Sequence, residues 1–235
     1  MKDDHCELRI ANCELRDARR IVIFCGHYGS GKTNIAVNYA LWRKRTADKV
    51  AIIDLDIVNP YFRTKDSDAE LQKAGVELIC SDYAGSNLDI PALPAEMQRP
   101  IADRSWTTVI DVGGDDQGAV ALGRFSDQIR DEGNYDMLFV ANFYRPLTRT
   151  PEEALGVLRE IEAACGLRFT GVVNNSNLGR ETTPADVLGT AQKAEALCKL
   201  ANLPLVMTTV EASLLDKMQK NSCQVFPLTL QSKIF

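Results

Sequence analysis

The sequence has few of the residues that build metal centres, disulfide frameworks or membrane anchors. It contains two histidines, His5 and His27, and none of its seven cysteines forms a C-x-x-C pair. A zinc site with the usual ligand spacing is therefore excluded, and scattered, odd-numbered cysteines are typical of reduced thiols in a cytoplasmic protein. No apolar run is long enough to cross a bilayer, and residues 1–5 are too polar for a secretory signal. We expect a cytoplasmic protein without an integral membrane segment.

The chain also lacks an excess of positive charge. Its 27 Lys and Arg stand against 32 Asp and Glu, which gives a net charge of -5. Proteins that bind nucleic acid or anionic membranes over a broad surface concentrate Lys and Arg there. The composition therefore disfavours a nucleic-acid partner, and any anion-binding site must be local.

A glycine-rich octapeptide, GHYGSGKT over residues 26–33, has the G-x-x-x-x-G-K-T spacing of a phosphate-binding loop, or P-loop. It follows the apolar run Ile21–Cys25 and precedes helical apolar spacing over residues 34–43. Strand, loop and helix N-terminus thus come in the order in which backbone N–H groups can bind phosphate. An ordinary glycine turn would not explain Lys-Thr at this offset. We therefore predict a nucleoside triphosphate site.

The residues of this loop have distinct chemical roles. Glycines permit backbone dihedrals that are closed to other residues. Lys32 is expected to reach the β- and γ-phosphates and to act in catalysis, while the Thr33 hydroxyl is expected to ligate Mg²⁺. The residues predicted to contact the nucleotide here are Gly26, His27, Tyr28, Gly29, Ser30, Gly31, Lys32, Thr33 and Asn34.

Short β-rich apolar runs alternate with helical segments along the chain. The runs with strand character are Ile21–Cys25, Val50–Asp54, Val76–Cys80, Thr107–Asp111, Met137–Asn142, Phe169–Asn174 and Leu205–Thr209. This alternation predicts βαβ units, and hence an α/β three-layer P-loop fold with a mostly parallel sheet of about seven strands and helices on both faces. We expect a single domain over residues 1–235, with 1–19 as a short N-terminal extension.

Two helix starts carry strong capping signals. Thr150 and Thr183 are each followed by a proline and, three residues on, by a carboxylate. The first helix is expected to end at Gly166. The second is expected to continue with Val187, Leu188, Ala191 and Leu197 on its apolar face. The proline-rich stretch over 81–104 is less regular, which favours a functional loop or a short helical insertion.

Aspartates follow two of the predicted strands. Asp54 and Asp56 end the run from Val50, and Asp111 ends the run from Thr107. In an open parallel sheet, ligands bind beyond the carboxyl ends of the strands. A single aspartate at a strand end is usually a turn or cap residue, but two such ends beside a P-loop favour a magnesium site, with Asp111 as the best ligand.

Three segments together resemble the CobQ/CobB/MinD/ParA group of P-loop proteins, within the class that also holds signal-recognition GTPases and metal-insertion NTPases. They are Lys32-Thr33, the run IDLDIVNP over 53–60, and Val109-Ile110-Asp111. MinD/ParA proteins carry a signature lysine after the first glycine of the loop, which crosses a nucleotide-sandwich dimer. This chain has His27 there, so the resemblance covers the triphosphate cradle but not that lysine. The resemblance still implies that a second copy of this chain is one candidate partner, in a homodimer.

The resemblance also implies roles for the aspartates. It makes Asp56 the residue that orients or activates the attacking water, and it places Asp54 and Asp111 in the Mg²⁺ shell. It further implies that 54–66 and 111–118 are switch segments. The loop GSGKT is similar to that of metal-insertion GTPases as well, which leaves GTP open.

An asparagine cluster follows the sixth predicted strand, where related proteins read the base. GTPases of the metal-insertion kind use Asn-Lys-x-Asp, whose carboxylate accepts from two guanine donors. If Asn174 and Asn177 take the Asn and Asp positions, an amide replaces that carboxylate and leaves a guanine donor unpaired, at a cost of about 1–3 kcal/mol. MinD/ParA-like proteins read adenine with an Asn here, which favours ATP bound by Asn174 or Asn175. A simple polar turn is the competing interpretation.

Two function classes remain open on these grounds. The first is a Mg²⁺-ATP-binding slow ATPase that acts as a nucleotide-dependent switch on a protein partner. The second is an ATP-dependent metabolic enzyme of the amide-ligase or small-molecule-kinase type, and a metal-insertion GTPase is a further alternative. A positioning ATPase acting on DNA or membrane is disfavoured by the acidic composition. Arg63 and Arg145 fall in predicted ligand loops, where they could neutralise phosphate charge or contact a partner.

Overall fold

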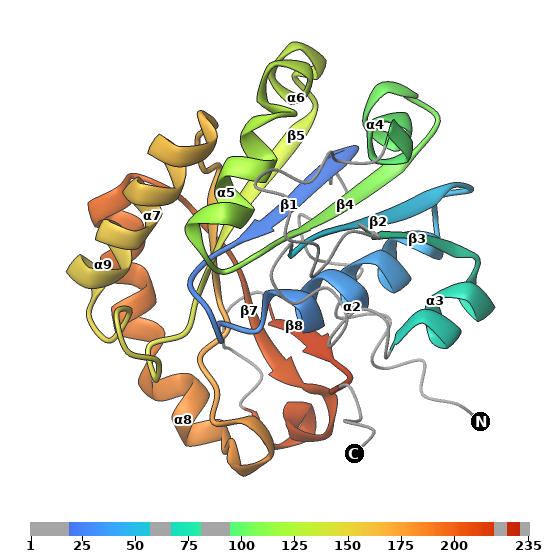
Figure 1. The fold of residues 1–235 in the computed structure, drawn as a ribbon. Helices are drawn as coiled ribbons and strands as arrows, with labels where there is room; N and C mark the ends of the chain where they lie inside the picture. The colour runs from blue at the N-terminus through green and yellow to red at the C-terminus, as the bar shows by residue number, and fades with distance from the viewer. Residues whose placement is uncertain (1–18, 57–66, 81–94, 219–224, 231–235) are drawn as a thin grey trace, which may run out of the picture.

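The sheet at the centre of the molecule is described in a computed structural model that covers residues 19–56, 67–80, 95–218 and 225–230 (Figure 1). These residues form an eight-stranded sheet in the order β3-β2-β4-β1-β5-β6-β7-β8, in which every neighbouring pair is parallel. The strands are β1 (Ile21–Cys25), β2 (Val50–Leu55), β3 (Val76–Cys80), β4 (Thr107–Val112), β5 (Tyr135–Ala141), β6 (Gly171–Asn174), β7 (Leu205–Glu211) and β8 (Val225–Leu228).

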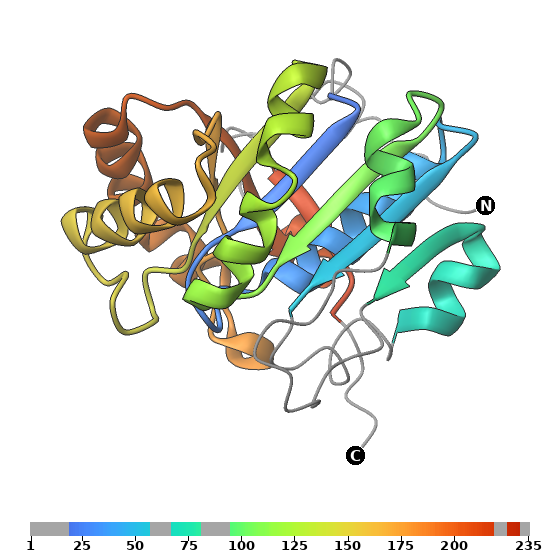
Figure 2. The same cartoon turned by 45° about the horizontal axis from the view of Figure 1, so that its top comes forward.

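Helices cover both faces of this sheet (Figures 1 and 2). One face carries α2 (Lys32–Lys44) and α3 (Asp68–Ala74). The other carries α4 (Ala95–Ala102), α5 (Asp116–Gly123), α6 (Ser126–Glu132), α7 (Pro151–Cys165) and α9 (Ala191–Ala201). The short α8 (Pro184–Gly189) packs with β7 and the 3-10 turn Ala212–Lys217 in a smaller cluster. The three-layer α/β architecture expected from the sequence is confirmed.

The central strands are buried on both sides, which explains their continuous apolar sequences. In β1, Ile21, Ile23 and Cys25 enter the core under α5 and α7, whereas Val22 and Phe24 enter the core under α2. All five residues of β1 are buried. The strand that leads into the P-loop is therefore held from both faces.

The seven predicted strands are all present, with ends that differ by at most two residues from the predicted ones. The expectation of about seven missed β8 (Val225–Leu228), which lies at the edge of the sheet. Its sequence, VFPL, contains Pro227, and proline is tolerated in a strand only where its missing N–H is not needed. The helix predicted from Thr150 is confirmed: a capping box opens α7, and Gly166 ends it in the left-handed conformation.

The helix predicted from Thr183 begins there with a capping box, but it does not run on to Leu197. It ends at Gly189, and a second helix, α9, starts at Ala191. Thr190 lies between them, where its hydroxyl donates to the carbonyl of Val187 at 2.9 Å and accepts from Asn174 at 3.1 Å. The helix is interrupted at Thr190, where this side chain is hydrogen-bonded to the end of β6. Leu188, which is predicted on the apolar face, is 42% exposed.

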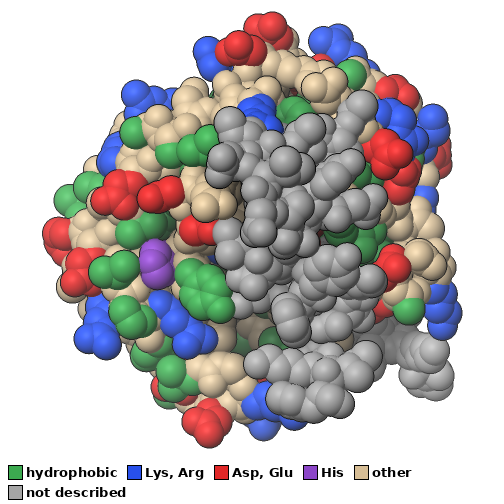
Figure 3. All heavy atoms as spheres, viewed as in Figure 1, with side chains coloured by type: hydrophobic (Ala, Val, Ile, Leu, Met, Phe, Trp, Pro, Cys, Tyr) green, Lys and Arg blue, Asp and Glu red, His purple; other side chains and the backbone are tan. Residues whose placement is uncertain are grey.

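Some sequence-based expectations lie outside the described residues. They include the N-terminal extension except residue 19, most of the switch segment over 54–66, and residues 81–94 of the irregular stretch. The remainder of that stretch forms the short helix α4. None of the described helices is long and apolar enough to span a bilayer. Acidic and basic side chains are interspersed on the face shown in Figure 3.

A buried arginine holds the sheet end opposite the P-loop. The guanidinium of Arg20, 9% exposed, donates to the carbonyls of Pro100 and Ile101 at 3.0 and 2.7 Å, near the C-terminus of α4. It also pairs with the Glu132 carboxylate at 2.9 Å, and this partner lowers the pKa of Glu132. The arrangement supplies donors to carbonyls in the last turn of α4, where the helix itself provides none.

We expect Arg20→Met to lower the free energy of unfolding by about 2 kcal/mol, because the buried Ile101 carbonyl loses its donor and the Glu132 carboxylate loses one of its two arginine partners. Arg104→Met is the matched control: Arg104 also pairs with Glu132, at 3.0 Å, but its side chain is 76% exposed, so its loss should cost less than about 1 kcal/mol. Urea unfolding followed by circular dichroism measures both. Equal losses would contradict the assigned role of Arg20.

Candidate nucleotide site

The octapeptide forms the loop between β1 and α2, with Lys32 as the first helical residue. Gly31 has φ 88°, and a Cβ there would overlap the side-chain amide of Asn175. A Cβ on Gly26 would lie 2.5 Å from the carbonyl oxygen of Val140. Glycine is required at both positions, for the left-handed backbone at one and for close approach to β5 at the other. The loop therefore has the strand-to-helix geometry predicted for a phosphate cradle.

The ammonium group of Lys32 lies over this loop. The side chain is buried, and its Nζ donates to the carbonyl of His27 at 3.2 Å. A Cβ on Gly114 would come within 3.0 Å of this Nζ and 2.7 Å of the Tyr28 backbone. The segment after β4 thus packs Gly114 against the backbone of the P-loop, and the Lys32 ammonium lies next to the same glycine.

Two of the predicted metal ligands lie side by side on neighbouring strands. Asp54 of β2 and Asp111 of β4 are register partners, and both are buried, at 3% and 2% exposure. Asp54 accepts from the backbone N–H of Asp56 at 2.9 Å. The Thr33 hydroxyl hydrogen-bonds Asp111. The structure therefore brings Thr33, Asp54 and Asp111 together, and their role as metal ligands stays a prediction.

The electrostatics of Asp111 are unusual. Burial, together with the negative charge of Asp54, raises its pKa to about 7, although Lys32 and Thr33 act in the opposite direction. Within the described ranges, the buried side-chain atoms without a hydrogen-bond partner are Asp111 Oδ1 and Ser30 Oγ. Both belong to this site. A buried polar group without a partner is costly, so these two atoms indicate a place built for a ligand.

The donor set suits Mg²⁺. This ion prefers oxygen ligands and is commonly bound by one or two carboxylates together with water and substrate phosphates. Thr33, Asp54 and Asp111 supply such oxygens. In the part of the chain that the structure describes, no group of three His, Cys, Asp or Glu side chains could enclose a metal by itself. The residues thus fit a magnesium ion shared with phosphate.

Asp56 lies where the two predicted switch segments meet. It is half-buried and is the last described residue before position 67. A Cβ on Gly113 would lie 3.3 Å from the Cα of Asp56, so the backbones after β2 and β4 are in close contact. Further along, Asp115 caps α5 by accepting from the N–H of Gly118 at 2.9 Å.

Asn175 supports the P-loop from the neighbouring half of the sheet. Its amide nitrogen donates to the carbonyl of Ser30 at 2.6 Å, and its amide oxygen accepts from the Thr209 hydroxyl. Its backbone N–H donates to the carbonyl of Ala141 at 2.8 Å. The sequence alone did not predict that Asn175 holds the P-loop backbone, or that Thr209 holds Asn175. Thr209 carries no motif, and only the pairing of β6 with β7 brings it close.

The side chain of Asn174 is also bound within the protein. Its amide nitrogen donates to Thr190, and its oxygen accepts from the hydroxyl and backbone N–H of Ser176 at 2.7 and 3.2 Å. It is 1% exposed. The structure places Asn175 behind the P-loop and holds the Asn174 side chain against Thr190 and Ser176. Base recognition by Asn174 or Asn175 stays a prediction.

Arg145 contacts the P-loop directly. This residue follows β5, and its Nε donates to the carbonyl of Gly29 at 3.1 Å. This contact places Arg145 beside the phosphate loop. Its two predicted roles, neutralising phosphate charge or contacting a partner, stay predictions. Arg63, the other candidate arginine, lies outside the described residues.

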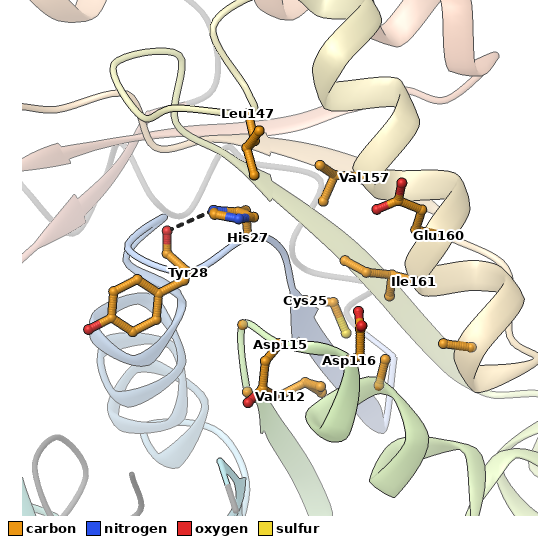
Figure 4. A pocket seen from close by; sticks show the side chains of 14 residues that line it. Cys25, His27, Tyr28, Val112, Asp115, Asp116, Leu147, Val157, Glu160 and Ile161 are labelled. Carbon is orange, nitrogen blue, oxygen red and sulfur yellow. Dashed lines mark hydrogen bonds between the residues drawn. The ribbon is translucent and has the colours of Figure 1, made fainter. Parts of the chain in front are cut away.

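His27 and Tyr28 form the outer part of the loop. The His27 Nδ1 lies 3.1 Å from the carbonyl oxygen of Tyr28, and the Tyr28 side chain is 57% exposed. In Figure 4 the Tyr28 ring points away from the neighbouring cavity, whereas His27 faces it. Asn34 lies in the first turn of α2, where its carbonyl accepts from Asn38 at 2.7 Å.

Comparison by sequence and by structure gives different results. No protein-family profile matches the chain, and no curated protein sequence is significantly similar to it. Similarity to known proteins is therefore found at the level of the fold.

Solved structures of FtsY proteins are similar to this chain. The cell division protein FtsY of Thermotoga maritima has a TM-score of 0.53 at 14% identity, over 85% of this chain and 66% of that one. FtsY of Mycoplasma mycoides has a TM-score of 0.52 at 17% identity, over 83% and 60%. The chain thus spans roughly two thirds or less of the length of these proteins, and it has the P-loop NTPase fold.

The raised pKa of Asp111 predicts how stability depends on pH. This pKa is about 7 in the folded chain and about 4 for an unfolded aspartate. Between these values the folded state holds a proton that the unfolded state releases, so stability falls as the pH rises. The full difference corresponds to about 4 kcal/mol.

Urea unfolding of the metal-free protein and of Asp111→Asn, from pH 4 to pH 8, measures this effect. The excess free energy of unfolding of the wild type over the variant should fall through this window, because the amide does not titrate. An excess that stays constant with pH would contradict the assignment.

Proposed function

We propose that the protein binds a Mg²⁺-nucleoside triphosphate, ATP in preference to GTP, at residues 26–33 and hydrolyses it slowly as a switch that acts on a protein partner. The observation that carries the proposal is the pair of buried, unpartnered atoms, Asp111 Oδ1 and Ser30 Oγ, together with the Lys32 ammonium, whose charge acts on Asp111. A polyanion with its cation would supply the charges and hydrogen bonds that these groups lack.

The proposed binding mode follows from the chemistry of the loop. Backbone N–H groups at the start of α2 and the Lys32 ammonium would bind the phosphates. Thr33, Asp54 and Asp111 would hold Mg²⁺, which neutralises phosphate charge. Ionisation of Asp111 is then favoured, because a divalent cation opposes the effect of burial and of the Asp54 charge.

Hydrolysis is assigned to Asp56. Its backbone is anchored to Asp54 and packed against Gly113, so its carboxylate belongs to the same strand-end cluster as the metal ligands. A carboxylate in this place can orient and deprotonate a water molecule. Slow turnover fits a switch in which positioning of water limits the rate.

The preference for ATP rests on residues 174–178, which contain no carboxylate. Asn177, at the position where a GTPase of the metal-insertion kind carries Asp, has an amide that donates to the carbonyl of Asn175 and accepts from the N–H of Gly179. Guanine presents two N–H donors that one carboxylate accepts together, and an amide oxygen serves only one.

The switch is assigned to the segment after β4. Gly113 touches Asp56, and Gly114 touches both Tyr28 and Lys32, so the γ-phosphate region and the start of α5 share backbone contacts. A change in the phosphates would shift Gly113–Asp116, and with it the cap of α5. The partner would be another protein or a second copy of this chain.

Calorimetry with Mg²⁺ should show ATP bound at least about fivefold more tightly than GTP, since an unpaired guanine donor costs about 1–3 kcal/mol. Lys32→Ala should bind neither nucleotide measurably, because the buried ammonium that neutralises the phosphates is gone. Its circular dichroism spectrum should match the wild type. Unchanged ATP affinity in a folded Lys32→Ala variant would refute the site, and tighter GTP binding would refute the ATP preference.

Asp56→Ala should retain Mg²⁺-ATP binding and lose about a hundredfold or more of the hydrolysis rate, as expected for loss of a residue that positions or deprotonates water. Phosphate release under single-turnover conditions measures this. Asp131→Ala, an exposed carboxylate on α6, is the control and should hydrolyse at the wild-type rate. Full turnover in Asp56→Ala would remove the catalytic role. Hydrolysis that requires an added metabolite would favour the metabolic-enzyme alternative.

A further inference from the structure

A cavity of about 460 Å³ lies beside the P-loop, between the N-terminal part of α5 and the middle of α7 (Figure 4). Its lining includes His27 and Tyr28 of the P-loop and the segment after β4, but its helical walls, α5 and α7, lie on the other face of the sheet from α2. Its volume falls in the range of pockets that bind small organic molecules. The nucleotide site proposed above leaves this cavity without a role.

The inner wall of the cavity is apolar. It is formed by Cys25 at the end of β1, Ala119 on α5, and Val157 and Ile161 on α7. Burial raises the pKa of the Cys25 thiol well above its usual value, so the thiol is neutral and contributes to the apolar wall. Leu147, 61% exposed and held at φ 65°, lies at the rim. A branched residue in the left-handed region is uncommon, and here it adds apolar surface at the mouth.

Three of the described residues that line the cavity are carboxylates, and His27 also lines it. Asp115 and Asp116 come from the start of α5, and Glu160 comes from α7 opposite them. Among the residues that the structure describes, no lysine or arginine lines the cavity. Asp115 is engaged as the α5 cap, whereas Asp116 and Glu160 are exposed and line the cavity from two different helices. Carboxylates from two facing helices create a negative potential over an apolar interior.

We propose that this cavity binds a small organic amine, with its apolar body against α7 and Cys25 and its ammonium group between Asp116 and Glu160. An anion would meet only repulsion from the carboxylates at the mouth. A neutral apolar molecule would gain the same interior contacts without the ionic attraction. The combination of apolar wall and acidic mouth therefore selects a cation on an apolar stem.

The cavity is joined to the nucleotide site through its own wall. Gly113 and Gly114 line the cavity, and the same glycines pack against Asp56, Tyr28 and Lys32. A bound amine would therefore bias the segment that responds to the phosphates, so amine and nucleotide affinities should be linked. This linkage, unlike the cavity itself, rests on the proposed nucleotide function.

Three matched probes test the pocket: 4-phenylbutylamine, 4-phenylbutanol and 4-phenylbutyrate. Titration into ¹⁵N-labelled, nucleotide-free protein should shift the amide resonances of Gly113, Gly114 and α7. The amine should bind about tenfold more tightly than the carboxylate, with the alcohol between them, as two exposed carboxylates each contribute up to about 1 kcal/mol. Equal binding of all three, shifts confined to other regions, or no binding by any of them would overturn the proposal.

The double variant Asp116→Asn with Glu160→Gln should remove the preference for the amine without changing the affinity for 4-phenylbutanol. Glu152→Gln, which removes an exposed carboxylate from the same helix but outside the cavity, should leave the preference intact. Val157→Phe should weaken all three probes by filling the interior. A preference that survives in the double variant would contradict the proposal.

Lys32→Ala separates this pocket from the proposed nucleotide function. Amine binding in that variant should equal that of the wild type, even though nucleotide binding is lost. If wild-type amine affinity changes at least about threefold on saturation with Mg²⁺-ATP, the two sites are linked. Unchanged affinity would overturn the linkage alone, and loss of amine binding in folded Lys32→Ala would overturn the pocket as an independent site.

Discussion

Two carboxylates buried next to each other on adjacent parallel strands, Asp54 and Asp111, impose the main electrostatic constraint on this molecule. Neither charge is stable in an apolar interior without compensation. The nearby groups that compensate are the Lys32 ammonium and the Thr33 hydroxyl, and both belong to the first turn of α2. The compensation is partial, as the raised pKa of Asp111 shows. The strand order β2-β4-β1 is what brings the carboxylates and the P-loop to one edge of the sheet.

The phosphate cradle is also held by the other half of the sheet. Asn175 after β6 and Arg145 after β5 each donate to a carbonyl of the P-loop, at Ser30 and Gly29. These two side chains thus hold the backbone of the P-loop in place from the half of the sheet on the other side of β1 from the carboxylates. Preorganised dipoles need no rearrangement when charge arrives. The carboxylates therefore define one side of the site, and the loops after β5 and β6 fix the shape of the other.

Much of this architecture is predictable from the sequence, because it depends on local signals. Seven strands are marked by buried apolar runs, and α7 is marked by its capping box and terminal Gly166. The P-loop is marked by an octapeptide, so its whole signal lies in eight consecutive residues. What escaped prediction depends on contacts between distant segments. Thr190 breaks a helix because it binds Asn174, and the edge strand β8 is short and contains Pro227. The roles of the asparagine amides were open for the same reason, since a side chain that can accept and donate is assigned only by its partners.

Asn175 could not be replaced by aspartate, although the two side chains have nearly the same shape. Aspartate has nearly the same volume, but it would replace the donor that faces the Ser30 carbonyl at 2.6 Å with a negatively charged acceptor. Two oxygens would then repel each other behind the P-loop. Deamidation of Asn175 to aspartate would therefore disturb the backbone of the phosphate cradle, although every residue that faces the ligand would be unchanged. This amide is buried, at 3% exposure, so the repulsion would arise where water could not screen it.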